Sequence, residues 1–240
     1  MSFSVNNRHD MSDYKRNFYE TMYSSRDSRR NDSRSSLVKK YTRTRYDVVF
    51  DLLPGGKRLL DVACGTGEFA FRAREKYDEV CGVDLTEVNI THAERNAVEW
   101  SMDNVSFLRA DADDLLPYED SCFDTVTCIA SLQFMFDPYH AIDEFSRVLK
   151  TDGTLVIQVV NAVYLPYRLT LLFGRFPVTA DQPGWDGGTL HYFTFSSLSG
   201  LFREKGFRVV KKTASGMLAG LRTWWPSLLN GDIIIRGTKL

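Results

Sequence analysis

The alternation of short apolar stretches with amphipathic stretches between residues 58 and 161 constrains the fold of this chain more than any other feature. Stretches such as "EVCGVDL" and "TLVIQVVN" are apolar along nearly their whole length, which is typical of strands buried on both faces of a parallel sheet. The segments between them fit helices that cover those two faces. The pattern therefore predicts an α/β fold with a mostly parallel sheet between layers of helices.

The periodicity also predicts where each element lies. We expect strands at residues 58–63, 79–85, 105–111, 123–130, 154–161, 207–214 and 232–238, with the last one antiparallel to its neighbour. We expect helices at residues 37–53, 68–77, 86–100, 141–150 and 196–206. Thr86 is expected to cap the third of these helices, and a further helix near the C-terminus is expected to hold Trp224 and Trp225.

The main domain is expected at residues 37–240. Two segments of the chain, one before this domain and one inserted within it, lack its regular pattern. Residues 1–36 are polar, but Tyr14, Phe18, Tyr19 and Tyr23 recur at helical spacing. These aromatic residues fit either a helix packed on the domain or a lid over a ligand. Residues 161–195 replace the expected helix with a stretch rich in proline and glycine, which predicts an inserted lid or substrate-binding segment.

Composition excludes several classes of protein. Net charge is −1, so no overall basic field favours a nucleic-acid partner. No apolar stretch has the length of a membrane span, and the N-terminal residues lack the apolar core of a signal peptide. The four cysteines form no C-x-x-C pair, which favours free thiols and no metal site. We therefore expect a cytoplasmic protein without stable membrane insertion.

The stretch "LLDVACGTGEFA" at residues 59–70 fits two kinds of cofactor loop. Gly65, Gly67 and Ala70 match the dinucleotide fingerprint, but they also match the loop of enzymes that bind S-adenosylmethionine. Carboxylates at Asp61 and Glu68 would repel a pyrophosphate placed at the start of the following helix. They suit a ligand that carries an amino group and a sulfonium, as S-adenosylmethionine does.

Two further acidic positions favour the same ligand. Asp84 ends the second strand and can bind both hydroxyls of an adenosine ribose, although NAD would present the same ribose. Asp111 and Ala112 follow the third strand, where an acid and the next backbone amide can bind the amino group of adenine. A dinucleotide enzyme has no special need for that spacing.

With these motifs, the chain resembles the class I S-adenosylmethionine-dependent methyltransferases. The stretches that match are "LLDVACGTG", "GVDLT", "RADADDLLPY", "FDTVTCIASLQFM" and "EFSRVLKTDGTLVI", in the order of the family. The resemblance implies a Rossmann-like three-layer sandwich, with a seven-stranded, mostly parallel sheet whose last strand is antiparallel. It also implies a set of cofactor-binding residues: Asp61, Ala63, Gly65, Gly67, Asp84, Leu85, Asp111, Ala112, Cys128 and Ile129.

The C-terminal part resembles a narrower group, the MetW-like branch among the type 11 methyltransferases. The stretches that match are "RLTLLFGRFPVT" and "PGWDGGTLHYFTFSSLSGLFREKGF". This resemblance does not fix a substrate.

The sequence offers few candidates for a residue that takes part in the chemistry. Related enzymes often have histidines after the fourth strand, where this chain has Gln133. His191 is the best remaining candidate for a general base, although it can instead only orient the inserted segment by a hydrogen bond. We expect His92 and His140 to lie on exposed helix surfaces. The candidates for contact with substrate, or for a lid, are Tyr19, Tyr23, Gln133 and Trp185.

The sequence thus predicts an enzyme that transfers a methyl group from S-adenosylmethionine to oxygen or nitrogen of a small-molecule acceptor. It would release S-adenosylhomocysteine and use no metal. Two alternatives stay open. The chain can be a non-catalytic S-adenosylmethionine-binding protein that acts with a partner enzyme, or an NAD-dependent oxidoreductase. A homodimer is also compatible with the sequence.

Overall fold

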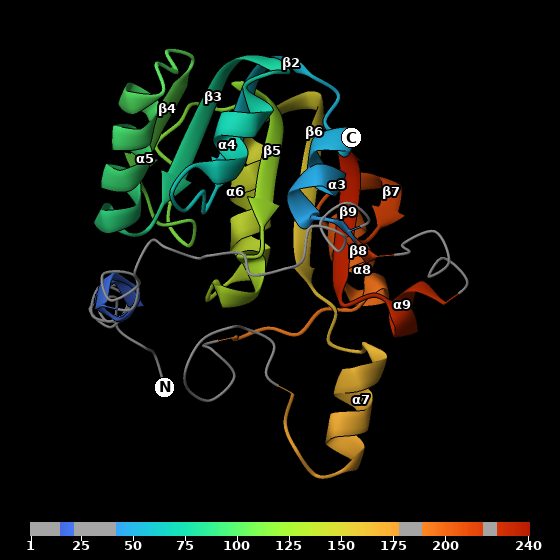
Figure 1. Ribbon diagram of the computed structural model, residues 1–240. Helices are drawn as coiled ribbons and strands as arrows, with labels where there is room; N and C mark the ends of the chain where they lie inside the picture. The colour runs from blue at the N-terminus through green and yellow to red at the C-terminus, as the bar shows by residue number, and fades with distance from the viewer. Residues whose placement is uncertain (1–14, 22–41, 178–188, 218–224) are drawn as a thin grey trace, which may run out of the picture.

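A seven-stranded sheet forms the centre of the computed structural model, which describes residues 15–21, 42–177, 189–217 and 225–240 (Figure 1). The strand order is β4-β3-β2-β5-β6-β9-β7, and β9 runs antiparallel to both of its neighbours. The expected sheet, with an antiparallel last strand, is confirmed. The strands are β2 (Gly56–Val62), β3 (Tyr77–Asp84), β4 (Val105–Arg109), β5 (Phe123–Ile129), β6 (Leu149–Val160), β7 (Phe207–Thr213) and β9 (Asp232–Lys239).

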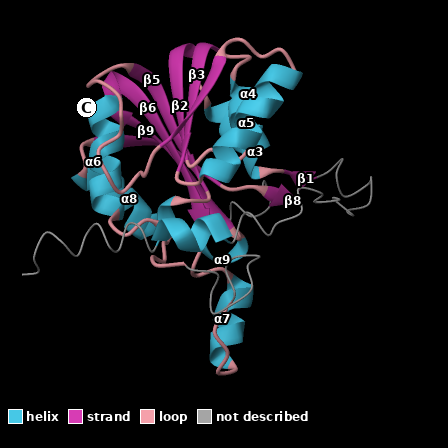
Figure 2. Ribbon diagram, turned by 90° about the vertical axis from the view of Figure 1, so that its left-hand side faces the viewer, coloured by secondary structure: helices cyan, strands magenta, loops and turns pink. Residues whose placement is uncertain are grey.

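Helices cover both faces of the sheet and make the three layers seen in Figure 2. One face carries α3 (Arg45–Leu52), α4 (Glu68–Ala73) and α5 (Glu87–Glu99), and the other carries α6 (Pro138–Val148) and α8 (Phe195–Glu204). Residues 15–21 are helical as well. The shorter elements are β1 (Thr42–Arg43) paired with β8 (Gly216–Met217), η1 (Leu132–Phe134), α7 (Leu165–Leu172) and α9 (Pro226–Leu229).

The apolar residues of each strand alternate between two buried clusters, one on each face of the sheet. Leu60, Val126 and Ile157 pack with α6 and α8, whereas Leu59, Val156 and Ile234 pack with α3 and α4. Burial on both faces explains why these strands read as continuous apolar runs. It also fixes the carboxyl ends of β2, β3, β4 and β5 side by side at one edge of the sheet.

Several helix boundaries differ from the prediction. The helix expected at residues 37–53 begins only at Arg45, because Thr44 and Asp47 form a reciprocal capping box there. The part of this range before residue 42 lies outside the described residues. The helix expected at residues 68–77 ends at Ala73, and Tyr77 enters β3, where its hydroxyl donates to buried Thr125.

Three further expectations are corrected. Thr86 occupies the N-cap position of α5, but its hydroxyl donates to Asp84 instead of capping the helix. Trp225 precedes the short helix α9 and is exposed, while Trp224 lies outside the described residues. The segment expected to lack a helix contains α7.

The four cysteines are free, as expected. Among the residues described, no helix is long and apolar enough to cross a membrane.

Candidate functional site

A cavity of about 900 Å³ opens at the carboxyl ends of β2, β3, β4 and β5. Ligands of open parallel sheets bind at this edge, and the volume suits a nucleoside-sized cofactor with room beyond it. The cavity brings together many of the residues predicted from the sequence. Those that line it are Tyr19, Ala63, Gly65, Asp84, Leu85, Asp111, Ala112 and Ile129.

The loop after β2 turns sharply beneath the cavity. Ala63 and Gly65 both have positive φ, at 58° and 56°, and a side chain added at Gly65 would point into open space. Gly67 serves a different purpose, because a Cβ atom there would come within 2.7 Å of the Phe107 ring. Gly65 therefore leaves room for a ligand, whereas Gly67 permits close packing inside the protein.

Asp84 organises the wall of the cavity. Its Oδ2 accepts a hydrogen bond from the backbone N–H of Gly65 at 2.9 Å. Its Oδ1 accepts from the amide and hydroxyl of Thr86 and from the side chain of Asn89, at 2.8–3.0 Å. Since a carboxylate offers about four acceptor positions, Oδ2 keeps one for a ligand hydroxyl.

Asp61 lies behind the loop and is only 2 % exposed. Among the described residues, the hydroxyl of Thr127 is the one side-chain donor to its carboxylate, at 2.7 Å. Burial, together with a smaller contribution from the nearby charge of Asp84, raises the pKa of Asp61 to about 7 against the opposing hydrogen bond from Thr127. A buried carboxylate with one neutral donor favours a cationic partner.

The helix at residues 15–21 closes one side of the cavity. The Nζ atom of Lys15 lies 2.8 Å from Oδ1 of Asp111 and also contacts the carboxylate of Asp113, and all three side chains are largely buried. Glu20 accepts from the backbone N–H of Glu87 at 2.6 Å, at the start of α5. The N-terminal helix is thus attached to the cavity wall at both of its ends.

Asp113 extends this attachment to the next loop. Its carboxylate accepts hydrogen bonds from the backbone N–H groups of Phe136 and Asp137, at 3.0 and 3.1 Å. Lys15 also lies over the Phe136 ring, 5.2 Å from its centroid. One pair of carboxylates, Asp111 and Asp113, therefore joins the N-terminal helix, the loop after β4 and the loop after η1.

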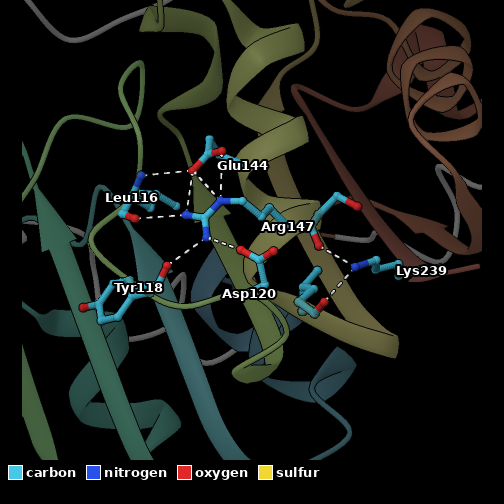
Figure 3. A network of polar contacts seen from close by, with 8 residues as sticks. Leu116, Tyr118, Asp120, Glu144, Arg147 and Lys239 are labelled. Atoms are coloured by element: carbon cyan, nitrogen blue, oxygen red, sulfur yellow. Dashed lines mark hydrogen bonds and ion pairs between the residues drawn. The ribbon is translucent and has the colours of Figure 1, made fainter.

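A polar network holds the loop after β4 from beneath (Figure 3). The guanidinium of Arg147 donates to the carbonyls of Leu116 and Tyr118 at 3.0 and 2.8 Å, and it pairs with Glu144 and Asp120. Burial opposes the charge of Glu144, but hydrogen bonds from Arg147 and from the Leu116 amide outweigh it and lower the pKa of Glu144. This network positions the loop that carries Asp111 and Ala112.

Four of the residues predicted to contact cofactor or substrate do not line the cavity. Cys128 is buried in the core on the α6 face, because its neighbour Ile129 takes the cavity-facing position. Asp61 and Gly67 lie behind the lining residues, as described above. Gln133 is buried, and its side-chain nitrogen donates to the carbonyl of Ala130.

His191 is placed beside Gln133 rather than in the cavity. Its backbone N–H donates to the carbonyl of Gln133 at 3.1 Å, and its Nε2 atom lies 3.3 Å from the carbonyl oxygen of Phe136. A ring nitrogen can hold that contact only as a donor. The geometry fits the orienting role better than the role of a base. Tyr23 and Trp185 lie outside the described residues.

The sequence analysis missed part of the lining. Tyr46, Ser131, Phe134 and Met135 all face the cavity, and Ala130 has a positive φ of 60°. His92, expected on an exposed surface, is half-buried at the cavity wall. Burial raises the pKa of Tyr46 against the opposing charge of Arg45, and the carboxylates of Glu68 and Asp61 raise it further. No local pattern marks these residues, since adjoining elements bring them together only in the folded chain.

The charges around the cavity decide which ligand it can hold. Lys15, Arg45 and Arg95 line it together with Glu68, Asp84 and Asp111, and Lys15 is paired with Asp111. At the loop after β2, Glu68 and Asp84 line the cavity and Asp61 lies directly behind. These residues suit a ligand with an ammonium at one end and a ribose and adenine at the other. Within the described part of the chain, no cluster of three metal-ligating side chains is present.

Comparisons with known proteins agree with this geometry. Residues 53–176 match a family model described as a methyltransferase domain. The chain is 36 % identical over 130 residues to the 27-O-demethylrifamycin SV methyltransferase of Amycolatopsis mediterranei, a match that covers 52 % of this chain and 47 % of that protein. It is 29 % identical over 134 residues to the ubiquinone biosynthesis O-methyltransferase of Alkalilimnicola ehrlichii, covering 55 % and 54 %. The chain spans about half the length of these curated relatives.

Solved structures share the fold over nearly the whole chain. A Thermotoga maritima protein described as a possible histamine N-methyltransferase has a TM-score of 0.61 at 22 % identity, covering 95 % of this chain and 98 % of its own. The [4+2]-cyclase SpnF has a TM-score of 0.60 at 23 % identity, covering 96 % and 94 %. A cyclase among these neighbours shows that the fold alone does not fix the reaction. The family match settles the membership: the chain belongs to the methyltransferase-domain family, within the class I S-adenosylmethionine-dependent methyltransferase superfamily.

Proposed function

We propose that this protein transfers a methyl group from S-adenosylmethionine to a small-molecule acceptor. The observation that carries the proposal is Asp61, a buried carboxylate that pairs with no cation among the described residues and lies behind the part of the cavity lined by Glu68 and Asp84. An ammonium group placed there would stabilise the ionised form of Asp61. A dinucleotide pyrophosphate would instead add negative charge to the same region.

The residues of the chain can be assigned to parts of this cofactor. Asp61 would attract the amino group from behind the loop after β2, Asp84 would accept from one ribose hydroxyl through Oδ2, and Asp111 with Ala112 would bind the adenine edge. When bound, S-adenosylmethionine supplies a methyl group already activated by the sulfonium. The protein then has to hold the acceptor in line with that group and exclude water. Lys15 and Glu20 support closure by holding the N-terminal helix against the cavity.

We further propose that the acceptor atom is a hydroxyl oxygen of a quinone-like or rifamycin-like molecule. Two relatives are named as O-methylating enzymes of this kind. Phe134, Met135 and Tyr46 give one part of the cavity an apolar lining that suits such a ring system.

His191 is assigned here as a positioning residue. It ties the segment after residue 188 to η1 through Gln133 and Phe136. His191→Gln keeps a side-chain donor and should therefore retain turnover, with an unchanged pH profile of kcat. Loss of turnover together with loss of the basic limb of that profile would instead identify His191 as the general base.

Turnover tests the function itself. The purified protein would be incubated with methyl-labelled S-adenosylmethionine and a panel of phenols, hydroquinones and amines, and methylated products would be identified by mass spectrometry. We expect label in a hydroxylated aromatic acceptor, and Asp61→Asn should reduce its formation. Cofactor binding without transfer to any acceptor would favour the accessory protein, and hydride transfer with NAD would favour the oxidoreductase.

A further inference from the structure

Helix α7 and the residues that directly follow it expose several large apolar side chains. None of its side chains is buried, and Figures 1 and 2 show it projecting beyond the sheet and the helices that cover it. Leu172 and Phe173 at its end are 77 % and 78 % exposed. Leu165, Leu169, Leu171 and Phe176 are also exposed. Contiguous apolar surface of this kind marks an interaction site, whereas single exposed residues do not.

The charged side chains of α7 and its flanking residues are all positive. Residues 161–177 contain Arg168 and Arg175 but no aspartate or glutamate, although the whole chain carries a net charge of −1. Both arginines are exposed. Arg175 lines a hollow of about 550 Å³ together with Leu169, Thr170 and Phe173. Positive charge therefore borders the apolar side chains directly.

The base of α7 is fixed to the body of the protein. The side chain of Asn161 donates to the carbonyls of Ser227 and Asn230 at 2.8 and 2.7 Å and accepts from the amide of Val163 at 3.2 Å. Arg168 donates to the carbonyl of Val163 at 2.7 Å. The helix is thus held in a defined direction at the carboxyl end of β6, with its apolar tip pointing away from the sheet.

These observations favour an anionic lipid surface over a second copy of the chain as the binding partner of α7. A second copy of the chain that packed α7 against α7 would bring the arginines of both copies together without an acid in either segment, and like charges at such an interface are unfavourable. An anionic lipid surface offers both matching features, since its phosphates pair with arginine and its acyl region accepts leucine and phenylalanine.

We propose that α7 and the residues that follow it, up to Phe176, dock on an anionic lipid surface. Leu169, Leu172 and Phe173 enter the boundary between headgroups and acyl chains, and Arg168 and Arg175 contact the phosphates. The contact is peripheral and reversible, because the helix is far too short to span a bilayer. The proposal does not depend on the identity of the methyl acceptor.

Vesicle flotation tests this proposal without cofactor or acceptor. Vesicles of phosphatidylcholine alone would be compared with an equal mixture of phosphatidylcholine and phosphatidylglycerol. We expect the full chain to float with the mixed vesicles at least about tenfold more tightly than with phosphatidylcholine, since each arginine near an anionic surface contributes to binding. High salt should reduce this difference.

Two variants make the result specific. Leu172→Asp combined with Phe173→Asp should abolish flotation, and Arg168→Glu combined with Arg175→Glu should remove the preference for phosphatidylglycerol. Val98→Asp is the matched control, because Val98 is 81 % exposed but lies on α5. Its flotation should equal that of wild type, and thermal unfolding should show that all variants fold.

Three results would overturn the proposal: no flotation of the wild type, equal binding to both vesicle types, or equal loss in the Val98→Asp control. A dimer in solution that Leu172→Asp and Phe173→Asp dissociate would show that a second copy covers α7 instead.

Discussion

Replacing Asp61 by asparagine should stabilise the cofactor-free protein while it weakens cofactor binding. The substitution keeps an acceptor oxygen for the hydroxyl of Thr127 and nearly the same volume, but it removes the ionisable group. The wild-type carboxyl has a pKa of about 7 in the folded chain, compared with an ordinary value of 3.8 for an exposed aspartate in the unfolded chain. The folded state therefore binds more protons than the unfolded state between these two values.

This difference sets the direction and size of the effect. As pH rises from about 4 to about 7, the wild type should lose stability, and above pH 7 the loss is complete. The difference between these two pKa values corresponds to about 4 kcal/mol of unfolding free energy. Asp61→Asn lacks this penalty, so its unfolding free energy should exceed that of wild type at pH 8 and approach it at pH 5.

Urea unfolding of the cofactor-free proteins at pH 5, 6, 7 and 8, values that bracket the wild-type pKa of about 7, measures the effect. In parallel, calorimetry would give the affinity for S-adenosylmethionine. Because an ammonium would bind the ionised carboxylate, wild-type affinity should rise up to about tenfold per unit of pH until pH 7, whereas the affinity of Asp61→Asn should be weaker and nearly independent of pH. Equal pH dependence of stability in both proteins would refute this account of Asp61, as would a variant less stable than wild type at pH 8.

Three further substitutions test other parts of the site. Asp84→Ala should weaken S-adenosylmethionine binding by about 1.5–3 kcal/mol, and an unchanged dissociation constant in calorimetry would remove Asp84 from the site. Lys15→Met breaks a buried ion pair. The helix at residues 15–21 should then detach and become sensitive to chymotrypsin. Unchanged resistance to chymotrypsin would contradict the role of this helix in closing the cavity. Arg147→Met leaves Glu144 buried without its cation and should cost about 3–5 kcal/mol in urea unfolding. The double variant with Glu144→Gln should recover part of this loss, and a loss below about 1 kcal/mol in the single variant would mean that the network does not position the loop.

The sequence predicted the sheet well because burial on two faces leaves a strong signal. Strands β3, β5 and β6 are buried along most of their length, and each was placed within a few residues of its true limits, apart from the early start of β6 at Leu149. Helix ends were less predictable because local hydrogen bonds decide them. Thr44 and Asp47 start α3 well inside the amphipathic stretch, and Asp84 takes the hydroxyl that Thr86 was expected to use as a cap.

The cofactor side of the site was predictable, while the opposite side was not. Gly65, Asp84 and Asp111 follow directly from strand ends, where a parallel sheet gathers its ligand-binding residues. Tyr46 and Lys15 come from helices outside that pattern, and only tertiary packing brings them to the cavity. Cys128 and Ile129 show the limit of a motif, since adjacent residues of a strand face opposite sides of the sheet.

The most direct test of the central claim is calorimetric titration of the wild-type protein with S-adenosylmethionine and, separately, with NAD. The carboxylates of Asp61, Glu68 and Asp84 around the loop after β2 predict saturable binding of S-adenosylmethionine at one site per chain, with little or no binding of NAD. Tight binding of NAD without detectable binding of S-adenosylmethionine would contradict the account.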